Sequence, residues 1–170
     1  RDSYIATFNH NIRENETFIY FAAHFHSKGL PVPEVLVVSE DQKIYIQEDV
    51  GSTSLLEVLE KEGKTERVYQ LFQKSLAALA RIQIVGDKGL DYNLCITAKE
   101  FGKQAILSDL LYFKYYFLDT LQLPYDKQAM IDDFEALSTY LTHTQYKYFM
   151  FRDFQSRNII VKENEVSFID

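Results

Sequence analysis

The sequence has little of what stabilises secreted chains or carries a chain through a membrane. Cys95 is the only cysteine among 170 residues, so no disulfide can form within the chain, which fits a reducing compartment. No stretch approaches the roughly 18 uninterrupted apolar residues that a membrane-spanning helix needs, and no signal peptide is visible. These absences predict a cytoplasmic protein without a membrane partner.

Positive charge is also scarce. The chain has 18 Lys and Arg against 25 Asp and Glu, a net charge of −7. Because a phosphate backbone selects basic surfaces, this balance argues against a nucleic-acid partner. Tryptophan is absent, whereas 13 Phe and 12 Tyr are present. They recur at helical spacing, so we interpret them as core residues rather than as a base-stacking platform.

The remaining composition, 46% hydrophobic and 25% charged, is typical of a globular chain with one sizeable core. The chain starts at Arg1 and ends at Asp170, directly after an apolar run, and we expect it to be the middle of a longer protein. Residues before the boundary at 48–51 are rich in predicted strands, and residues after it are rich in predicted helices.

The strand-rich part begins with a β-branched and aromatic segment at 4–8, which predicts a strand. A helix is predicted over 11–28, with Asn11 as its N-cap. Its buried face follows i, i+3, i+4, i+7 spacing and comprises Phe18, Phe21, Ala22 and Phe25. A hairpin follows, with strands predicted at 35–38 and 43–50.

The helix-rich part contains four predicted helices, at 53–63, 65–85, 97–121 and 125–144. Three apolar runs then follow, at 148–151, 158–161 and 166–169, and we expect each to be a strand. The last two are separated by "KENE" and predict a β-hairpin.

Polar residues stand at the joints of this terminal unit. Asp153 and Asn158 flank a four-residue loop, and hairpin closure would carry Asp170 back towards Asn158. A carboxylate and an amide placed together are hard-cation ligands of the kind that Mg²⁺ takes. The other carboxylate, Asp153, is placed to accept a hydroxyl proton. A general base beside two metal ligands is the set of groups that phosphoryl transfer requires.

The spacing D-x-x-x-x-N is a weak signal when it stands alone, because chains of this length contain it by chance. The alternative interpretation is a structural hairpin with polar corners. The flanking apolar runs and the terminal aspartate make the whole pattern rarer, and they favour the phosphoryl-transfer site.

On these residues the sequence resembles the aminoglycoside phosphotransferase and choline kinase branch of the protein-kinase-like superfamily. The kinase catalytic loop H-R-D-x-x-x-x-N appears as "FRDFQSRN", and "SFID" ends where the metal-binding aspartate of D-F-G would stand. The resemblance implies that Asp153 is the catalytic base, that Asn158 and Asp170 hold Mg²⁺, and that Gln155 lies near the transferred phosphate.

The resemblance extends along the chain and implies an α+β, two-lobed, protein-kinase-like fold. Residues 1–50 would form a partial N-lobe and hinge, and residues 51–170 a C-lobe with a substrate-helix insertion at about 91–122 and a catalytic loop at 151–158. The resemblance also includes the L-P-V-P segment and implies that Glu16 is the ion-pairing glutamate of the αC helix. It further implies a hinge near Gln47, Glu48 and Asp49, whose backbone would bond the adenine edge.

Some features depart from the family pattern. Phe151 replaces the catalytic-loop histidine, and Ala6 or Thr7 stands roughly where the phosphate-contacting lysine is expected. The glycine-rich phosphate loop is absent from this sequence. Phosphate binding would then depend on the metal site, on residues outside the sequence, or on Arg157.

Other residue types give weaker signals. His24 and His26 stand two apart on a helix and so point to different faces, which disfavours a metal site. Cys95 is better explained as a buried structural thiol than as a nucleophile.

The sequence thus predicts an ATP- and Mg²⁺-dependent phosphotransferase acting on a small hydroxylated metabolite. The aromatic-rich insertion and "RDF" are most like bacterial relatives that phosphorylate N-acetylated sugars, so we expect an amino or N-acetylated sugar as the acceptor. The alternative is a catalytically silent kinase-like domain that binds nucleotide, which the missing lysine motivates.

Overall fold

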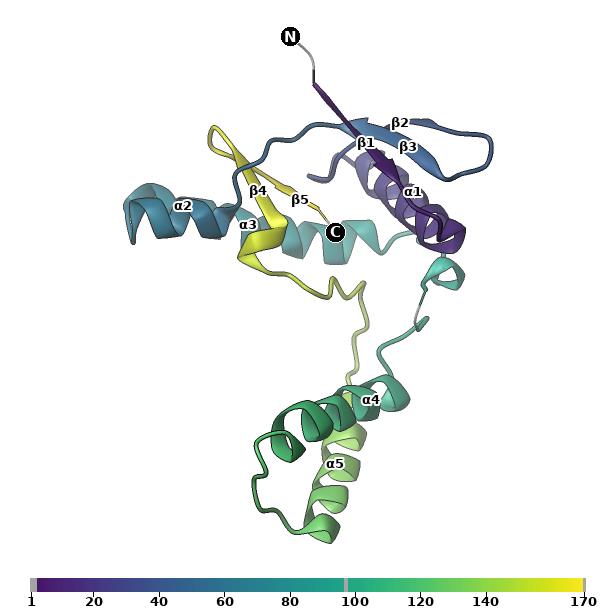
Figure 1. Cartoon of the computed structure of the whole chain (residues 1–170), viewed down its shortest axis with the longest axis vertical. Coiled ribbons are helices and arrows are strands. Elements are labelled where there is room, and N and C mark those ends of the chain that lie inside the picture. Colours follow the sequence, from purple (N-terminus) through teal and green to yellow (C-terminus); the bar gives the residue numbers. More distant parts are fainter. Residues whose placement is uncertain (1–2, 97, 170) are drawn as a thin grey trace. The chain divides into compact units, whose positions relative to one another are not determined.

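The structure is a computed structural model that describes residues 3–96 and 98–169. It divides into two compact units (Figure 1). One comprises residues 3–96 and 148–169, and the other comprises residues 98–147. Helices and small antiparallel sheets are mixed along the chain, which confirms the α+β class.

The division into units differs from the expected lobe boundary at 48–51. Residues on both sides of that boundary belong to the first unit, and the separate unit is 98–147. The substrate-helix insertion expected at about 91–122 therefore overlaps this unit but does not coincide with it. The two-lobed organisation stays a prediction.

Three antiparallel strands form the first sheet, in the order β1 (Tyr4–Phe8), β3 (Ile44–Glu48), β2 (Val35–Val38). The strands at 4–8 and 35–38 match the sequence prediction, and β3 is shorter than the predicted 43–50. Alternate residues of a strand share a face, so Tyr45 and Gln47 point to the same side of β3. The ring of Tyr45 stacks on Phe18, and that side therefore faces the helix α1.

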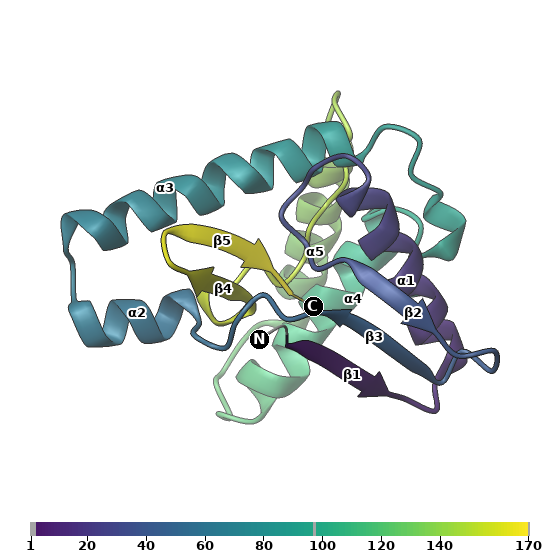
Figure 2. The same cartoon turned by 90° about the horizontal axis from the view of Figure 1, so that it is seen from above.

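Helix α1 spans Ile12–His26, and the side chain of Asn11 caps it by accepting a hydrogen bond from the Glu14 amide. Its buried residues include Ala22 and Phe25, as the apolar spacing predicted. Figure 2 shows α1 alongside the β1–β3–β2 sheet.

Two helices follow the sheet, α2 (Leu55–Glu62) and α3 (Glu66–Arg81), and a π-helical turn, η1 (Ile82–Gly86), continues α3. Ser54 and Glu57 form a reciprocal capping box at the start of α2. The main hydrophobic core joins these helices to α1 and to the terminal hairpin; among its members are Phe25, Leu30, Leu55, Leu71, Ile82, Ile159, Val161 and Phe168.

The terminal hairpin pairs β4 (Ile159–Lys162) with β5 (Glu165–Phe168), as predicted. The third predicted strand, at 148–151, was wrong, because this segment has no strand structure. Instead, the ring of Phe149 contacts Phe25, and the ring of Phe151 contacts Phe168. The apolar run is explained by ring packing, not by strand pairing.

The second unit contains α4 (Lys103–Phe113), a π-helical segment η3 (Lys114–Asp119) and α5 (Lys127–Thr142). An ion pair between Lys103 and Glu135 links α4 to α5. Many large apolar side chains of this unit are exposed, among them Tyr112, Phe113, Tyr115, Tyr116, Phe117, Leu121, Ile131, Leu137 and Tyr140. Across residues 3–96 and 98–169, no helix is long and apolar enough to cross a membrane.

Candidate functional site

The predicted catalytic loop is an irregular segment that closes on itself. Asp153 is exposed and has a left-handed backbone, with φ of 49°. Such a conformation is uncommon outside glycine, although aspartate tolerates it better than most residues, and it is found in turns and at functional sites. The short 3₁₀ turn Ser156–Asn158 (η4) follows directly. The carboxylate of Asp153 is thereby presented on a tight turn.

Asn158 ties the two ends of this loop together. Its side-chain nitrogen donates to the Asp153 carbonyl at 3.2 Å, and its backbone amide donates to the Gln155 carbonyl at 2.9 Å. The structure therefore brings Asp153, Gln155 and Asn158 into one loop. Because the nitrogen of the Asn158 amide faces the loop, its oxygen is the atom available to a cation.

Asp170 lies outside the described residues, but the chain next to it is described. Ile159 pairs with Phe168 across the hairpin, and the Ile169 amide donates to the Asn158 carbonyl at 3.1 Å. The backbone immediately before Asp170 is thus beside Asn158. This register agrees with the expected return of the chain towards Asn158.

A cavity of about 450 Å³ lies in the same unit, between α1 and β3. Glu14, Phe18 and Phe21 line it from α1, and Tyr45 and Gln47 line it from β3. Its other lining residues are Asn9, Asn15, Thr17, Pro33, Ile96 and Ile169. Ile169 connects this cavity to the end of the terminal hairpin.

Glu14, not Glu16, is the glutamate that α1 turns towards the cavity. Glu16 is exposed and is not among the cavity residues. The reason is helical geometry: two positions along a helix rotate a side chain by roughly 200°. A signal for Glu14 was present in the sequence, because it stands four residues before Phe18 and seven before Phe21, on the face predicted to be buried.

In β1, where the family pattern has a phosphate-contacting lysine near Ala6 or Thr7, Thr7 contacts a tyrosine of the neighbouring strand. Thr7 of β1 is paired with Tyr45 of β3, and its hydroxyl bonds the Tyr45 side chain. Burial raises the pKa of Tyr45, and the negative charge of Glu14 acts in the same direction. The carboxylate of Glu14 accepts a hydrogen bond from the Asn9 side chain at 3.1 Å. A neutral amide thus contacts the glutamate in this structure.

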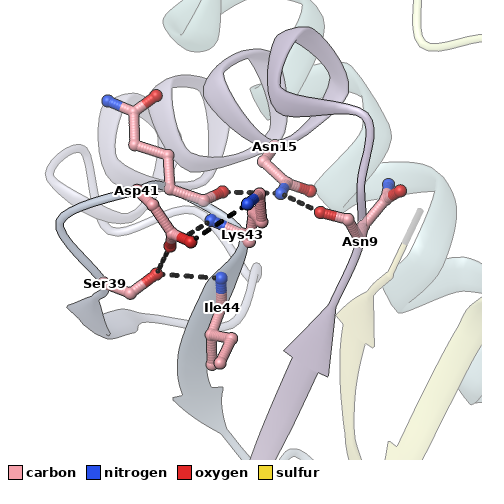
Figure 3. A network of polar contacts seen from close by, with 7 residues as sticks. Asn9, Asn15, Ser39, Asp41, Lys43 and Ile44 are labelled. Carbon is pink, nitrogen blue, oxygen red and sulfur yellow. Dashed lines mark hydrogen bonds and ion pairs between the residues drawn. The ribbon is translucent and has the colours of Figure 1, made fainter.

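Asn15 is a buried residue that sequence analysis missed. It is 2% exposed, and its side-chain nitrogen donates to the Asn9 carbonyl at 3.1 Å and to the Gln42 carbonyl at 2.6 Å. Figure 3 shows its amide between Asn9 and the turn that carries Asp41 and Lys43. It therefore joins the β1–α1 connection to the β2–β3 turn, and no periodicity in the sequence marks such a role.

The three predicted hinge residues, Gln47, Glu48 and Asp49, differ in which of their polar groups already form hydrogen bonds. The Glu48 amide already donates to the Glu34 carbonyl at 2.9 Å, so it is engaged in the sheet. The Asp49 carboxylate bonds the Ser3 side chain and the Gly51 amide, and both contacts lower its pKa. The side chain of Gln47 lines the cavity. If a nucleobase bonds the hinge backbone, the groups from Asp49 onwards are better placed than the Glu48 amide.

One side of α1 is bonded along its length to the segment 86–96. The contacts are Arg13 to the Ile96 carbonyl, Thr17 to the Leu94 carbonyl, Tyr20 to the Asp91 amide, His24 to the Gly86 carbonyl and Lys28 to the Lys88 carbonyl. The first four recur every three or four positions, which places them on one face of α1, and Lys28 stands in the turn just after the helix. The helix that carries Glu14 is thus held in place by backbone of the same unit.

Other sequence expectations concern His24 and Cys95. His24 bonds a backbone carbonyl, and among residues 3–96 and 98–169 no group of three His, Cys, Asp or Glu could hold a metal ion. Cys95 is partly buried, and this burial raises the pKa of its thiol. A raised pKa disfavours the thiolate and fits a structural role.

The donor chemistry at the hairpin end fits Mg²⁺. An amide oxygen of Asn158 and a carboxylate at position 170 are hard oxygen ligands, and Mg²⁺ binds in proteins through one or two such groups plus water and phosphate. Such a site has one carboxylate and one amide from the protein, so it would not appear as a group of three His, Cys, Asp or Glu residues. One ligand would precede β4 and the other would follow β5, both at the open end of the hairpin, where Ile159 pairs with Phe168.

The sheet order, the helix α1 and the loop–hairpin unit together are consistent with part of a kinase-like fold. A sequence model of the phosphotransferase enzyme family matches residues 2–170. The chain therefore belongs to this family, and the resemblance to aminoglycoside phosphotransferases and choline kinases is confirmed. Comparisons with curated proteins and with solved structures found no match.

Proposed function

We propose that this chain carries the catalytic loop and metal ligands of a kinase that transfers the γ-phosphoryl group of ATP to a hydroxyl of a small metabolite. Membership of the phosphotransferase family supports the reaction class. The observation that carries the proposal is the closed loop in which Asn158 bonds the Asp153 carbonyl. It presents a carboxylate and an amide oxygen from one short segment.

In this mechanism Asp153 accepts the proton of the acceptor hydroxyl while that oxygen bonds to the γ-phosphorus. The bond from the γ-phosphorus to the bridging oxygen of ADP breaks, and the proton later passes from Asp153 to water. Asn158 and Asp170 would hold Mg²⁺, which neutralises phosphate charge when it is bound. Gln155 lies between base and metal ligand in the same loop.

The acceptor we propose is an amino or N-acetylated sugar, on the resemblance of "RDF" and the aromatic-rich helices to sugar kinases. Partners are then a nucleotide and this small molecule, without nucleic acid or membrane, in the cytoplasm. The net charge of −7 supports the expectation of no nucleic-acid partner, and the single cysteine supports the cytoplasm.

The test uses the full-length protein with γ-labelled ATP, Mg²⁺ and a panel of amino sugars, N-acetyl sugars, choline and aminoglycosides. We expect transfer to one class of acceptor. Asp153→Asn should reduce the rate by about 10²–10⁴-fold, the usual contribution of a general base, while nucleotide binding is retained. Glu60→Gln makes the same chemical change on the exposed face of α2 and should have no effect.

Unchanged turnover in Asp153→Asn would show that Asp153 is not the base. Mg²⁺-dependent ATP binding without transfer to any acceptor would instead favour the catalytically silent, nucleotide-binding domain.

A further inference from the structure

The side chain of Gln47 has an unused hydrogen-bond acceptor. Its Oε1 atom is buried and has no hydrogen-bond partner among the described residues. A buried polar atom without a partner carries a desolvation penalty, so such atoms are rare and call for an explanation. Gln47 lines the cavity between α1 and β3, and a rotation of its terminal amide towards that cavity would let a bound ligand supply the missing donor.

The composition of the cavity narrows the class of ligand. Among the residues that the structure describes, those lining it include a carboxylate, Glu14, but no lysine or arginine. Among the described lining residues, a phosphate group would meet the carboxylate of Glu14 with no basic side chain beside it. Phe18, Phe21 and Tyr45 supply aromatic surface, which suits a planar ring. The cavity therefore fits a ring with an amino donor better than it fits the phosphate end of a nucleotide.

The position of Gln47 on β3 connects this cavity to the expected hinge. It stands one residue before Glu48, whose amide is engaged in the sheet, and two before Asp49, where the strand has ended. A base bonded to the chain at Asp49 or beyond would have its edge next to the Gln47 side chain. The same unit carries the Asp153 loop, so base and phosphates would be held by one body.

We propose that Gln47 selects the nucleobase: its Oε1 accepts a hydrogen bond from the exocyclic amino group of adenine. Guanine carries a carbonyl oxygen at the same ring position, and two acceptors would then face each other in a buried site. This inference rests on the proposed nucleotide-dependent function and adds the residue that distinguishes ATP from GTP.

The experiment compares purines that differ at this ring position; GTP also carries a 2-amino group, and ITP has the same carbonyl oxygen without it. With the full-length protein, we would measure kcat/KM for ATP, GTP, ITP and purine riboside triphosphate, and the calorimetric affinity for adenosine and purine riboside. Purine riboside lacks the amino group and introduces no acceptor. We expect ATP and adenosine to be favoured by about tenfold over the purine riboside forms, because the unpaired Oε1 is then buried against the ligand. GTP and ITP should be poorer still.

The variant Gln47→Met keeps the length of the side chain and removes the acceptor, so the preference for ATP should fall to within about twofold of unity. Gln42→Met is the matched control. The Oε1 atom of Gln42 is also buried without a described partner, but Gln42 does not line the cavity. This control should keep the wild-type preference.

Three outcomes are distinguishable. Loss of discrimination in Gln47→Met alone supports the proposal. Nucleotide binding with an unchanged preference in Gln47→Met, or a wild-type preference for GTP, overturns the role of Gln47 and leaves the phosphotransferase function standing. Absence of any nucleotide binding in the presence of Mg²⁺ overturns both.

Discussion

At the scale of single residues, the side chains of largest consequence are polar groups that local backbone holds in place. Asn158 holds the Asp153 loop through one side-chain bond, and Asn15 joins two turns through two bonds. In both cases an amide nitrogen satisfies carbonyl groups that lie outside regular structure. Buried carbonyls without such partners would destabilise the fold.

Replacing Asn15 by leucine tests this role. Asn15→Leu keeps a similar volume but leaves the Asn9 and Gln42 carbonyls without their donor, and we expect a loss of about 1–3 kcal/mol in the free energy of unfolding. Chemical denaturation measures it. Glu16→Leu, at the exposed neighbouring position, should change stability by less than about 0.5 kcal/mol. Equal effects of the two substitutions would show that the buried amide has no special role.

At the scale of elements, helix termini decide where the chain changes direction. The capping box at the start of α2 contains three contacts: the Ser54 amide and hydroxyl donate to the Glu57 carboxylate, and the Glu57 amide donates to the Ser54 hydroxyl. The bonds from the Ser54 amide and then from its hydroxyl lower the pKa of Glu57. Ser54 also forms a β-bridge with Ile160, so this cap lies next to the terminal hairpin.

This lowered pKa predicts a pH-dependent contribution to stability. A carboxylate whose pKa is lower in the folded than in the unfolded state stabilises the fold above its ordinary pKa, about 4.3, and loses that effect as the pH falls through the folded value. Glu57→Gln keeps a capping side chain but does not titrate. We therefore expect wild type to be the more stable protein at pH 7 and the difference to shrink towards pH 3.

Denaturation at several pH values measures this difference, with Glu60→Gln on the same helix as the control. A difference between wild type and Glu57→Gln that is independent of pH would contradict the charge-assisted cap.

At the scale of the whole chain, the two units differ in how much they bury. The main hydrophobic core cluster lies entirely in the unit formed by residues 3–96 and 148–169. In the described part of the second unit, only Ile106 and Ser138 are buried. Because stability follows buried apolar area, local opening should need less free energy in the second unit.

Hydrogen exchange of the 170-residue chain tests this difference. Amides of α4 and α5 should exchange well before those of α3, whose residues Val68, Leu71 and Ser75 are buried. The comparison of α5 with α3 is matched, since each has 16 residues. Equal protection of α5 and α3 would show that the apolar side chains of the second unit are covered in solution.

Local patterns were sufficient to predict much of this protein. The spacing of Phe18, Ala22 and Phe25 identified one helix with a buried face, and the pattern of the last residues identified the β4–β5 hairpin. "FRDFQSRN" indicated the phosphotransferase family, which the match over residues 2–170 confirms. Such features depend on neighbours within a few residues, and sequence spacing reports them directly.

Contacts between distant segments were decided only by the tertiary structure. The rings of Phe149 and Phe151 pack into the core instead of forming a strand. Helical rotation places Glu14 rather than Glu16 at the cavity. The buried Oε1 atom of Gln47, which has no described hydrogen-bond partner, could be found only once the packing of α1 against β3 was known. The sequence determined which elements form and which family they belong to, because those depend on short-range pattern. The tertiary structure decided which polar atoms lie together, because that depends on packing between segments tens of residues apart.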